Sequence, residues 1–188
     1  SRPRRFGKSL LISTLEAYFL GKKELFEGLA MEKLEKDWIT YPIFHIDLNT
    51  EKYDTRESLD SILNFTLEKW EQQYGTAPSE TTFALRFRGL IERAYKQTGQ
   101  RVVILIDEWD CIFREFKQNM EAQKKYLDFL RAWLKDKDYV ALAYMTGILP
   151  IKKYGSHSAL NMFTEYSMTD PDELAGVTAS DIQKIANA

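Results

Sequence analysis

The sequence predicts an α/β domain in which helices pack against a mostly parallel β-sheet. The strongest observation is the segment from Val102 to Ile106, five consecutive apolar residues that favour β-structure. Such a run is typical of a strand that is covered on both faces, as strands are in parallel sheets. Apolar runs at Pro42 to Leu48 and at Tyr139 to Met145 predict two further strands. Because helical patterns separate these runs, we expect an α/β layered domain that spans residues 1–188.

The first part of the chain is expected to hold a helix, two short helical pieces and a strand. The helix should run from near Leu10 to Gly21, a plausible C-terminal stop. The residues at helical spacing are Leu10, Leu11, Thr14, Leu15, Tyr18 and Phe19. Residues 24–38 predict short helical pieces, and the strand follows them.

Two long helices are predicted next, at about residues 56–74 and 79–97. The stretch between them carries Gly, Pro and Ser, which suits a turn with Ser79 as the N-cap of the second helix. Gly99 is expected to end that helix. After the strand at Val102 to Ile106, a helix at residues 121–136 is expected.

The last third of the chain predicts further elements beyond the strand at Tyr139. The segment from Met162 to Met168 indicates another strand. Residues 178–187 predict a terminal helix with Thr178 as its cap.

The composition is that of an ordinary globular domain. Hydrophobic residues make up 44% of the 188 positions, charged residues 29%, and the formal net charge is −2. This balance provides no overall positive field for nucleic acid or an anionic membrane. The longest apolar runs are too short to cross a bilayer. The single cysteine, Cys111, cannot form an internal disulfide, which fits a reducing compartment, and we expect a cytoplasmic location.

Gly7, Lys8 and Ser9 stand directly before the first helix and match the end of a P-loop. The full pattern is Gly, four residues, then Gly-Lys-Ser or Gly-Lys-Thr. Glycine lets the backbone approach phosphate, lysine reaches the outer phosphates, and the hydroxyl can bind magnesium. The helix N-terminus also attracts anions. Arg2 occupies the place of the first glycine, so a basic turn before a helix is the alternative.

Basic residues flank this loop. Arg2, Arg4 and Arg5 would make a phosphate site more electropositive, although a solvated basic surface is an equal alternative for any one of them. We assign nucleotide contacts to the residues of this loop. They are Arg4, Arg5, Phe6, Gly7, Lys8, Ser9 and Leu10.

The strand from Val102 to Ile106 ends in two acidic residues, a pattern typical of a Walker B strand. Asp107 is predicted to hold magnesium together with Ser9, and Glu108 to polarise the attacking water as a general base. Asp110 adds a further carboxylate nearby. A strand that ends in a charged loop is the alternative, but the upstream Gly-Lys-Ser favours a nucleotide site. Thr146, at the end of the next strand, could orient water or contact the terminal phosphate, or could be an ordinary strand-end residue.

Several segments together resemble the bacterial AAA-ATPase-like family, in the same order along nearly the whole chain. They are Arg2-Pro3-Arg4-Arg5-Phe6-Gly7-Lys8-Ser9, Leu25-Phe26-Glu27-Gly28-Leu29, Ile106-Asp107-Glu108-Trp109-Asp110, Met145-Thr146-Gly147-Ile148-Leu149, Ser158-Ala159-Leu160-Asn161 and Glu165-Tyr166-Ser167. The first segment is the most specific, because this family has Arg where the usual P-loop has its first glycine. Arg2 therefore agrees with the family.

The resemblance implies a P-loop NTPase-like three-layer sandwich and a second, PD-(D/E)XK-type nuclease domain after the ATPase domain. It also implies a strand before the P-loop, so this chain resembles a fragment that begins inside a motif and ends before the C-terminal part. The missing strand would lie between those at 139–146 and 162–168. We therefore expect a gap in the sheet or a frayed first turn, and we expect the isolated piece to be inactive.

Taken together, these features predict an ATP-binding domain that uses magnesium and hydrolyses ATP in the full-length protein, where it would control the nuclease-like domain. Two alternatives stay open. One is a regulatory switch that binds the nucleotide and hardly hydrolyses it. The other is a nucleic-acid-processing module, which the acidic balance does not support. The oligomeric state is not predicted.

Other residues that could carry chemistry are more readily explained by packing. Neither His45 nor His157 has a cysteine or carboxylate at ligand spacing, so a zinc site is not expected. Cys111 has no adjacent histidine and is expected to pack in the core. Trp109 is expected to be a packing residue, with a place beside the nucleotide as the alternative. Arg131 is expected in a helix-surface ion pair, with an arginine finger as the alternative.

Overall fold

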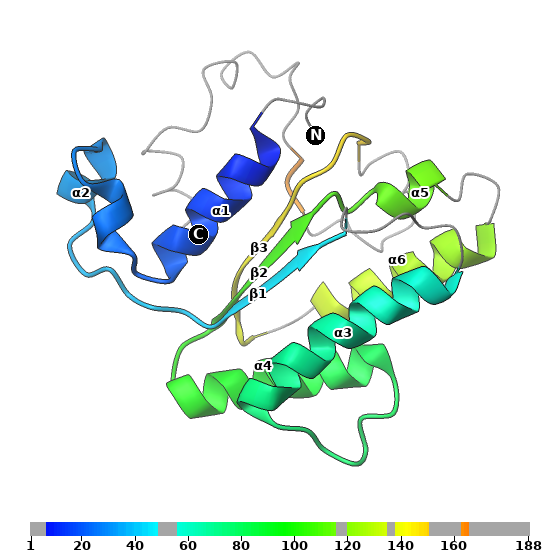
Figure 1. Ribbon diagram of the computed structural model, residues 1–188. Coiled ribbons are helices and arrows are strands. Elements are labelled where there is room, and N and C mark those ends of the chain that lie inside the picture. Colours follow the sequence, from blue (N-terminus) through cyan, green and yellow to red (C-terminus); the bar gives the residue numbers. More distant parts are fainter. Residues whose placement is uncertain (1–6, 49–55, 116–119, 135–137, 151–162, 166–188) are drawn as a thin grey trace.

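The computed structural model describes residues 7–48, 56–115, 120–134, 138–150 and 163–165. These residues form an α/β arrangement in which helices and parallel strands alternate (Figure 1). The elements are α1 (Lys8–Phe19), η1 (Lys23–Phe26), α2 (Ala30–Leu34), β1 (Ile43–Asp47), α3 (Arg56–Tyr74), α4 (Phe83–Thr98), β2 (Val102–Asp107), α5 (Cys111–Glu115), α6 (Met120–Leu134) and β3 (Val140–Met145). The predicted α/β class is confirmed.

The sheet of the described residues has three strands in the order β1-β2-β3, and both pairings are parallel. Helix α1 covers one face, whereas α3, α4 and α6 lie on the other (Figure 1). The result is the three-layer, P-loop-like sandwich that the sequence predicts. All three strands point the same way, so their carboxyl ends meet at one edge of the sheet, close to the start of α1 (Figure 1).

Strand β2 forms the centre of both hydrophobic cores. Its residues alternate between the two faces, as the period of a β-strand requires. Val102, Ile104 and Ile106 pack in the larger core against α3, α4 and α6. Val103 and Leu105 pack in the smaller core under α1. All six residues of β2 are buried, which confirms the prediction of a strand covered on both faces.

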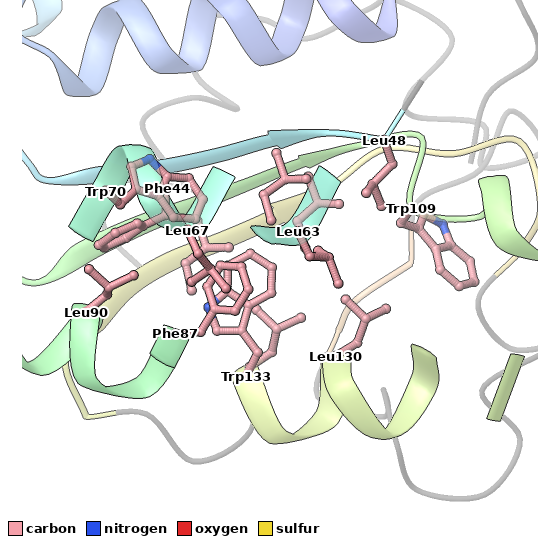
Figure 2. Close-up of a cluster of buried hydrophobic side chains, with 14 of the residues drawn as sticks. Phe44, Leu48, Leu63, Leu67, Trp70, Phe87, Leu90, Trp109, Leu130 and Trp133 are labelled. Atoms are coloured by element: carbon pink, nitrogen blue, oxygen red, sulfur yellow. The ribbon is translucent and has the colours of Figure 1, made fainter. Parts of the chain in front are cut away.

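The larger core is rich in aromatic side chains. Phe44 from β1 packs edge to face against Trp70 of α3, with ring centroids 4.7 Å apart. Trp70 contacts Phe87 of α4, and the ring centroids of Phe87 and Trp133 of α6 lie 4.4 Å apart. These rings join one strand and three helices in a continuous contact chain (Figure 2). This packing holds α3, α4 and α6 against one face of the sheet. The carboxyl ends of the strands lie beyond it, at the edge of the sheet.

Strand β3 differs from its prediction. The run from Tyr139 to Met145 predicts a buried strand, but all six residues of β3 are only partly buried. Within the described part of the chain, β2 is the one strand paired with β3, so β3 forms an edge. An apolar run does not reveal how many neighbouring strands will cover it, which explains the error.

The connection between α3 and α4 is also longer than predicted. Helix α4 begins at Phe83 and its N-cap is Thr82, whose side chain accepts a hydrogen bond from the Leu85 N–H at 3.3 Å. Ser79 therefore does not cap the helix. Glu80 turns back to pair with Arg93, and this contact holds the segment before α4 in a non-helical path. The predicted end at Gly99 is confirmed by its left-handed backbone.

Some predictions concern residues that the structure does not describe. The strand at residues 162–168 falls there except for 163–165, which are not in a strand, and the helix at 178–187 falls there entirely. The position of the missing strand therefore stays a prediction. Among the described helices, none combines the length and apolar character that crossing a membrane would require.

Candidate functional site

The first helix begins at the predicted loop. Gly7 precedes α1 with φ of 72°, a left-handed conformation that favours glycine. It caps the helix without a side chain, so the amides of the first turn receive no side-chain hydrogen bond from the N-cap residue. Lys8 and Ser9 are the first two residues of α1. The loop and helix therefore place a lysine and a hydroxyl at a helix N-terminus, where the helix dipole favours anions.

Ser9 and Asp107 meet although they lie 98 positions apart in the sequence. The Ser9 Oγ donates a hydrogen bond of 2.6 Å to Asp107 Oδ2. The other carboxylate oxygen accepts hydrogen bonds from the Thr146 hydroxyl and, at 3.0 Å, from the Glu108 N–H. Asp107 is 4% exposed. The predicted metal ligands and Thr146 thus meet at the carboxyl ends of β2 and β3, where Asp107 and Thr146 are buried and Ser9 is exposed.

Glu108 lies where the chain leaves β2. Its φ is 56°, an uncommon conformation for a residue other than glycine. The Lys8 Nζ lies 3.1 Å from its Oε1, and Arg114 of α5 donates a hydrogen bond to its Oε2. The side chains of Lys8, Glu108 and Arg114 are 7%, 13% and 17% exposed, respectively. The predicted general base is therefore bound on both oxygens by cations in this structure.

Thr146 continues the parallel pairing beyond β3. Its N–H donates to the Ile106 carbonyl at 2.9 Å, and its carbonyl accepts from the Trp109 N–H at 2.9 Å. These backbone bonds explain why its hydroxyl reaches Asp107. The residue is 6% exposed. Both of its predicted alternatives, a role beside the nucleotide and a strand-end structural role, are compatible with this position.

Asp110 has a larger structural role than the sequence indicates. It is fully buried, and its Oδ2 accepts hydrogen bonds from the Ile148 and Leu149 N–H groups at 3.0 and 2.7 Å. Its Oδ1 lies 3.5 Å from Arg114 Nε. Arg114 was not among the predicted site residues. The i,i+4 spacing of Asp110 and Arg114 is the one sequence signal that could have found it.

The remaining predicted residues lie in different surroundings. Arg4, Arg5 and Phe6 fall outside the described residues. Leu10 is 71% exposed on α1, so its side chain does not join this cluster. Arg131 is exposed on α6.

The packing expectations are confirmed for the residues that the structure describes. Trp109 is 2% exposed and belongs to the larger core, as does Cys111. The Nδ1 of His45 lies 3.0 Å from Glu16 Oε2, a contact between β1 and α1. These residues contribute to the fold around the site.

Magnesium is chemically compatible with this oxygen-rich position. Ser9 and Asp107 present a hydroxyl and a carboxylate next to each other. Magnesium prefers such oxygen ligands, and it commonly takes only one or two from protein and the rest from water and phosphate. Over the described residues, no group of three or more His, Cys, Asp or Glu side chains could hold a metal by itself. The fit therefore depends on phosphate and water completing the shell.

A P-loop-like α/β sandwich with Gly-Lys-Ser at its first helix defines the broad class of this chain. Within that class, residues 1–156 match the AAA-ATPase-like family, described as a predicted AAA-ATPase, and the chain belongs to this family. The resemblance drawn from the sequence motifs is thus confirmed. The family description indicates an AAA-type ATPase domain and, at a coarse level, nucleotide binding.

One curated relative is an uncharacterized protein in the vnfD 5' region of Azotobacter chroococcum mcd 1. It is 31% identical to this chain over 191 residues, which covers 98% of the chain and 37% of the relative. The chain therefore spans little more than a third of that protein. No solved structure matches.

Proposed function

We propose that this chain binds ATP together with Mg²⁺ and that it hydrolyses ATP in the full-length protein. The observation that carries the proposal is the meeting of Lys8 and Ser9 with Asp107 and Glu108. The first pair opens a helix and the second ends a buried parallel strand. Ligands of open α/β sheets bind beyond the carboxyl ends of the strands, which is where these side chains lie.

Each residue has a separate role in this proposal. The amides around Gly7 and the Lys8 ammonium bind the β- and γ-phosphates, and Ser9 and Asp107 hold the metal ion. Magnesium supplies neutralisation of the phosphate charge when it is bound. The hydrogen bonds from Ser9 and Thr146 fix the Asp107 carboxylate in one orientation.

Glu108 is the residue to which we assign activation of water. It must exchange its contact with Lys8 for one with water, because an ammonium ion at 3.1 Å occupies one of its oxygens. Thr146 stands behind Asp107 and orients that carboxylate. Positioning and charge neutralisation supply most of the catalysis in phosphoryl transfer.

The test is isothermal titration of the full-length protein with ATP and magnesium. We expect Lys8→Ala to weaken binding by at least about tenfold, equivalent to about 1.4 kcal/mol. Lys33→Ala, which removes an exposed lysine of α2, is the matched control and should bind as the wild type does. Equal affinity in Lys8→Ala and wild type would rule out the assigned phosphate loop.

A non-hydrolysing switch is the second candidate function. The two cations on Glu108 favour it, because a carboxylate that stays bound in this way cannot accept a proton from water. Turnover of Glu108→Gln distinguishes the two functions. Loss of turnover supports hydrolysis through Glu108, whereas a wild type that binds ATP without turnover supports the switch.

We also propose, from the family resemblance, that the ATP state governs a nuclease-like domain of the full-length protein. The test is DNA cleavage by the wild type and by Lys8→Ala, with and without ATP. DNA-stimulated turnover with a steep salt dependence would instead support direct nucleic-acid processing.

A further inference from the structure

The carboxylate of Glu108 lies between two cations from different elements. Lys8 comes from the start of α1, and Arg114 comes from α5. Lys8 contacts one carboxylate oxygen at 3.1 Å and Arg114 contacts the other. Since each oxygen has its own cation, either contact can break while the other stays.

This arrangement sets up a competition at Lys8. The proposed function requires the Lys8 ammonium to bind phosphate, but in this structure a protein carboxylate is already beside it. The two side chains are 7% and 13% exposed, so solvent screens their attraction less than it screens a surface pair. An incoming phosphate must therefore displace Glu108 from Lys8.

Arg114 is built to keep Glu108 after that displacement. Its Nε faces the fully buried Asp110 at 3.5 Å while its terminal nitrogen binds Glu108. Asp110 is itself fixed by the Ile148 and Leu149 amides. The planar guanidinium can serve two carboxylates at once, which a lysine at this position would do less well.

We propose that Glu108 is an internal competitor for Lys8 in the nucleotide-free protein, and that Arg114 is the positioning residue that retains Glu108 when phosphate takes Lys8. This inference rests on the proposed function. Nucleotide binding then changes the partners of Glu108 from two cations to one. The exchange leaves one carboxylate oxygen available for water and keeps the side chain oriented by α5.

The first test compares the MgATP affinity of the full-length wild type and Glu108→Gln by isothermal titration. Removing the competing charge should tighten binding by about two- to fivefold, which corresponds to the usual contribution of an ion pair. Glu92→Gln is the matched control, because Glu92 pairs with Arg88 on the surface of α4. Its affinity should equal that of the wild type. Unchanged or weaker binding by Glu108→Gln overturns the competition.

The two proposals fail in different ways. If Lys8→Ala and wild type bind MgATP equally, or neither binds, the proposed function fails. If wild type binds and Lys8→Ala does not, the proposed function stands, and the Glu108→Gln affinity alone decides the competition.

The second test concerns Arg114 and uses Arg114→Met, Arg114→Lys and their combinations with Glu108→Gln. Arg114→Met should weaken MgATP binding, because Glu108 then depends on Lys8 alone, and Arg114→Lys should restore part of the loss. In the Glu108→Gln background the effect of Arg114→Met should largely disappear. A loss that persists there shows a purely structural role for Arg114 and overturns its assignment. Arg88→Met is the matched control.

A third measurement needs no nucleotide. Unfolding midpoints of Lys8→Met, Glu108→Gln and the double variant should be non-additive, because the first substitution removes the partner of the second. Additive shifts would contradict the Lys8–Glu108 contact. If Arg114→Met does not fold, Arg114→Lys with and without Glu108→Gln provides the same comparison, since it keeps a charge beside Asp110.

Discussion

Two groups of ion pairs in this molecule have similar residues but different arrangements. The first joins α3, the segment before α4, and α4 itself. Arg86 of α4 donates two hydrogen bonds of 2.7 Å to the two carboxylate oxygens of Glu71 in α3. Arg93, further along α4, binds both carboxylate oxygens of Glu80. Each arginine is paired with one carboxylate through two hydrogen bonds.

The second group lies at the carboxyl ends of β2 and β3. Its two cations, Lys8 and Arg114, contact two carboxylates, those of Glu108 and Asp110. Here one carboxylate is shared by two cations, and one arginine is shared by two carboxylates.

The difference teaches how pairing relates to function. Carboxylate and arginine paired one to one have a single favourable arrangement, so they fix the packing of helices. In the second group a shared side chain can lose one ionic contact and keep the other. An added anion or metal ion can therefore redistribute these contacts. Shared charges at a strand end are therefore more informative about function than the number of ion pairs.

The largest expected effect breaks the second group at its buried anchor. Asp110→Ala leaves Arg114 without its second carboxylate and two backbone amides without their acceptor. Removing one partner of a buried charged pair typically destabilises by about 3–5 kcal/mol. Denaturant unfolding measures the loss, and Asp60→Ala, an exposed position on α3, should change little. A loss as small as that of Asp60→Ala would show that Asp110 is not the anchor.

The sequence predicts the sheet better than its edges. The run from Val102 to Ile106 predicts β2 from local sequence alone, because a strand that is buried on both faces is apolar throughout. The same reasoning overstates the burial of β3, whose exposure depends on neighbours that local pattern does not reveal. The sequence does not predict helix α5, because its five residues are too few to show a helical period.

The candidate site follows the same division. Gly-Lys-Ser and Asp-Glu are short local patterns with known chemistry, and the fold brings Ser9 to Asp107 and Lys8 to Glu108. The i,i+4 spacing from Asp110 points to Arg114, but the contact between Arg114 and Glu108 could not be predicted, because it depends on a left-handed turn at Glu108. Partners formed by such a turn are visible only in three dimensions.

The next effect concerns the close approach of β3's end to Trp109. A Cβ added to Gly147 would lie 2.5 Å from Trp109 Nε1 and 2.9 Å from Asp110 Oδ1. We expect Gly147→Ala to destabilise the fold by about 1–3 kcal/mol, as overpacking usually does. Thermal unfolding measures it, and a smaller loss in the Trp109→Phe background would confirm the indole as the obstacle. An equal loss in both backgrounds would contradict that explanation.

The first group should respond to pH in a defined direction. The hydrogen bond from Arg86 lowers the pKa of Glu71 below its ordinary value of 4.5. A carboxyl with a lowered folded pKa adds stability that is present above its unfolded pKa and is lost as pH falls through the folded pKa. Arg86→Met should therefore cost about 1–2 kcal/mol near neutral pH, and the difference from wild type should shrink below about pH 4.5.

The Arg86→Met variant also tests the comparison with the second group, at the carboxyl ends of β2 and β3. Arg86 lies between helices and has no contact with the candidate site in the described structure. Its loss should leave MgATP affinity unchanged while stability falls, whereas Arg114→Met should change affinity as well. Equal effects of both substitutions on MgATP binding would remove the distinction between the two groups.

The smallest expected effect separates the neutral cap of α4 from the charged pairs around it. Thr82 accepts a hydrogen bond from the Leu85 N–H, so Thr82→Ala should destabilise by about 1 kcal/mol, the usual contribution of an N-cap. Ser79→Ala should change stability by less than about 0.5 kcal/mol, since this exposed side chain does not cap the helix. Denaturant unfolding of both variants decides between the two starts of α4. If Ser79→Ala were the more damaging, α4 would begin earlier, and the Glu80–Arg93 contact that holds its approach in a non-helical path would lose its structural role.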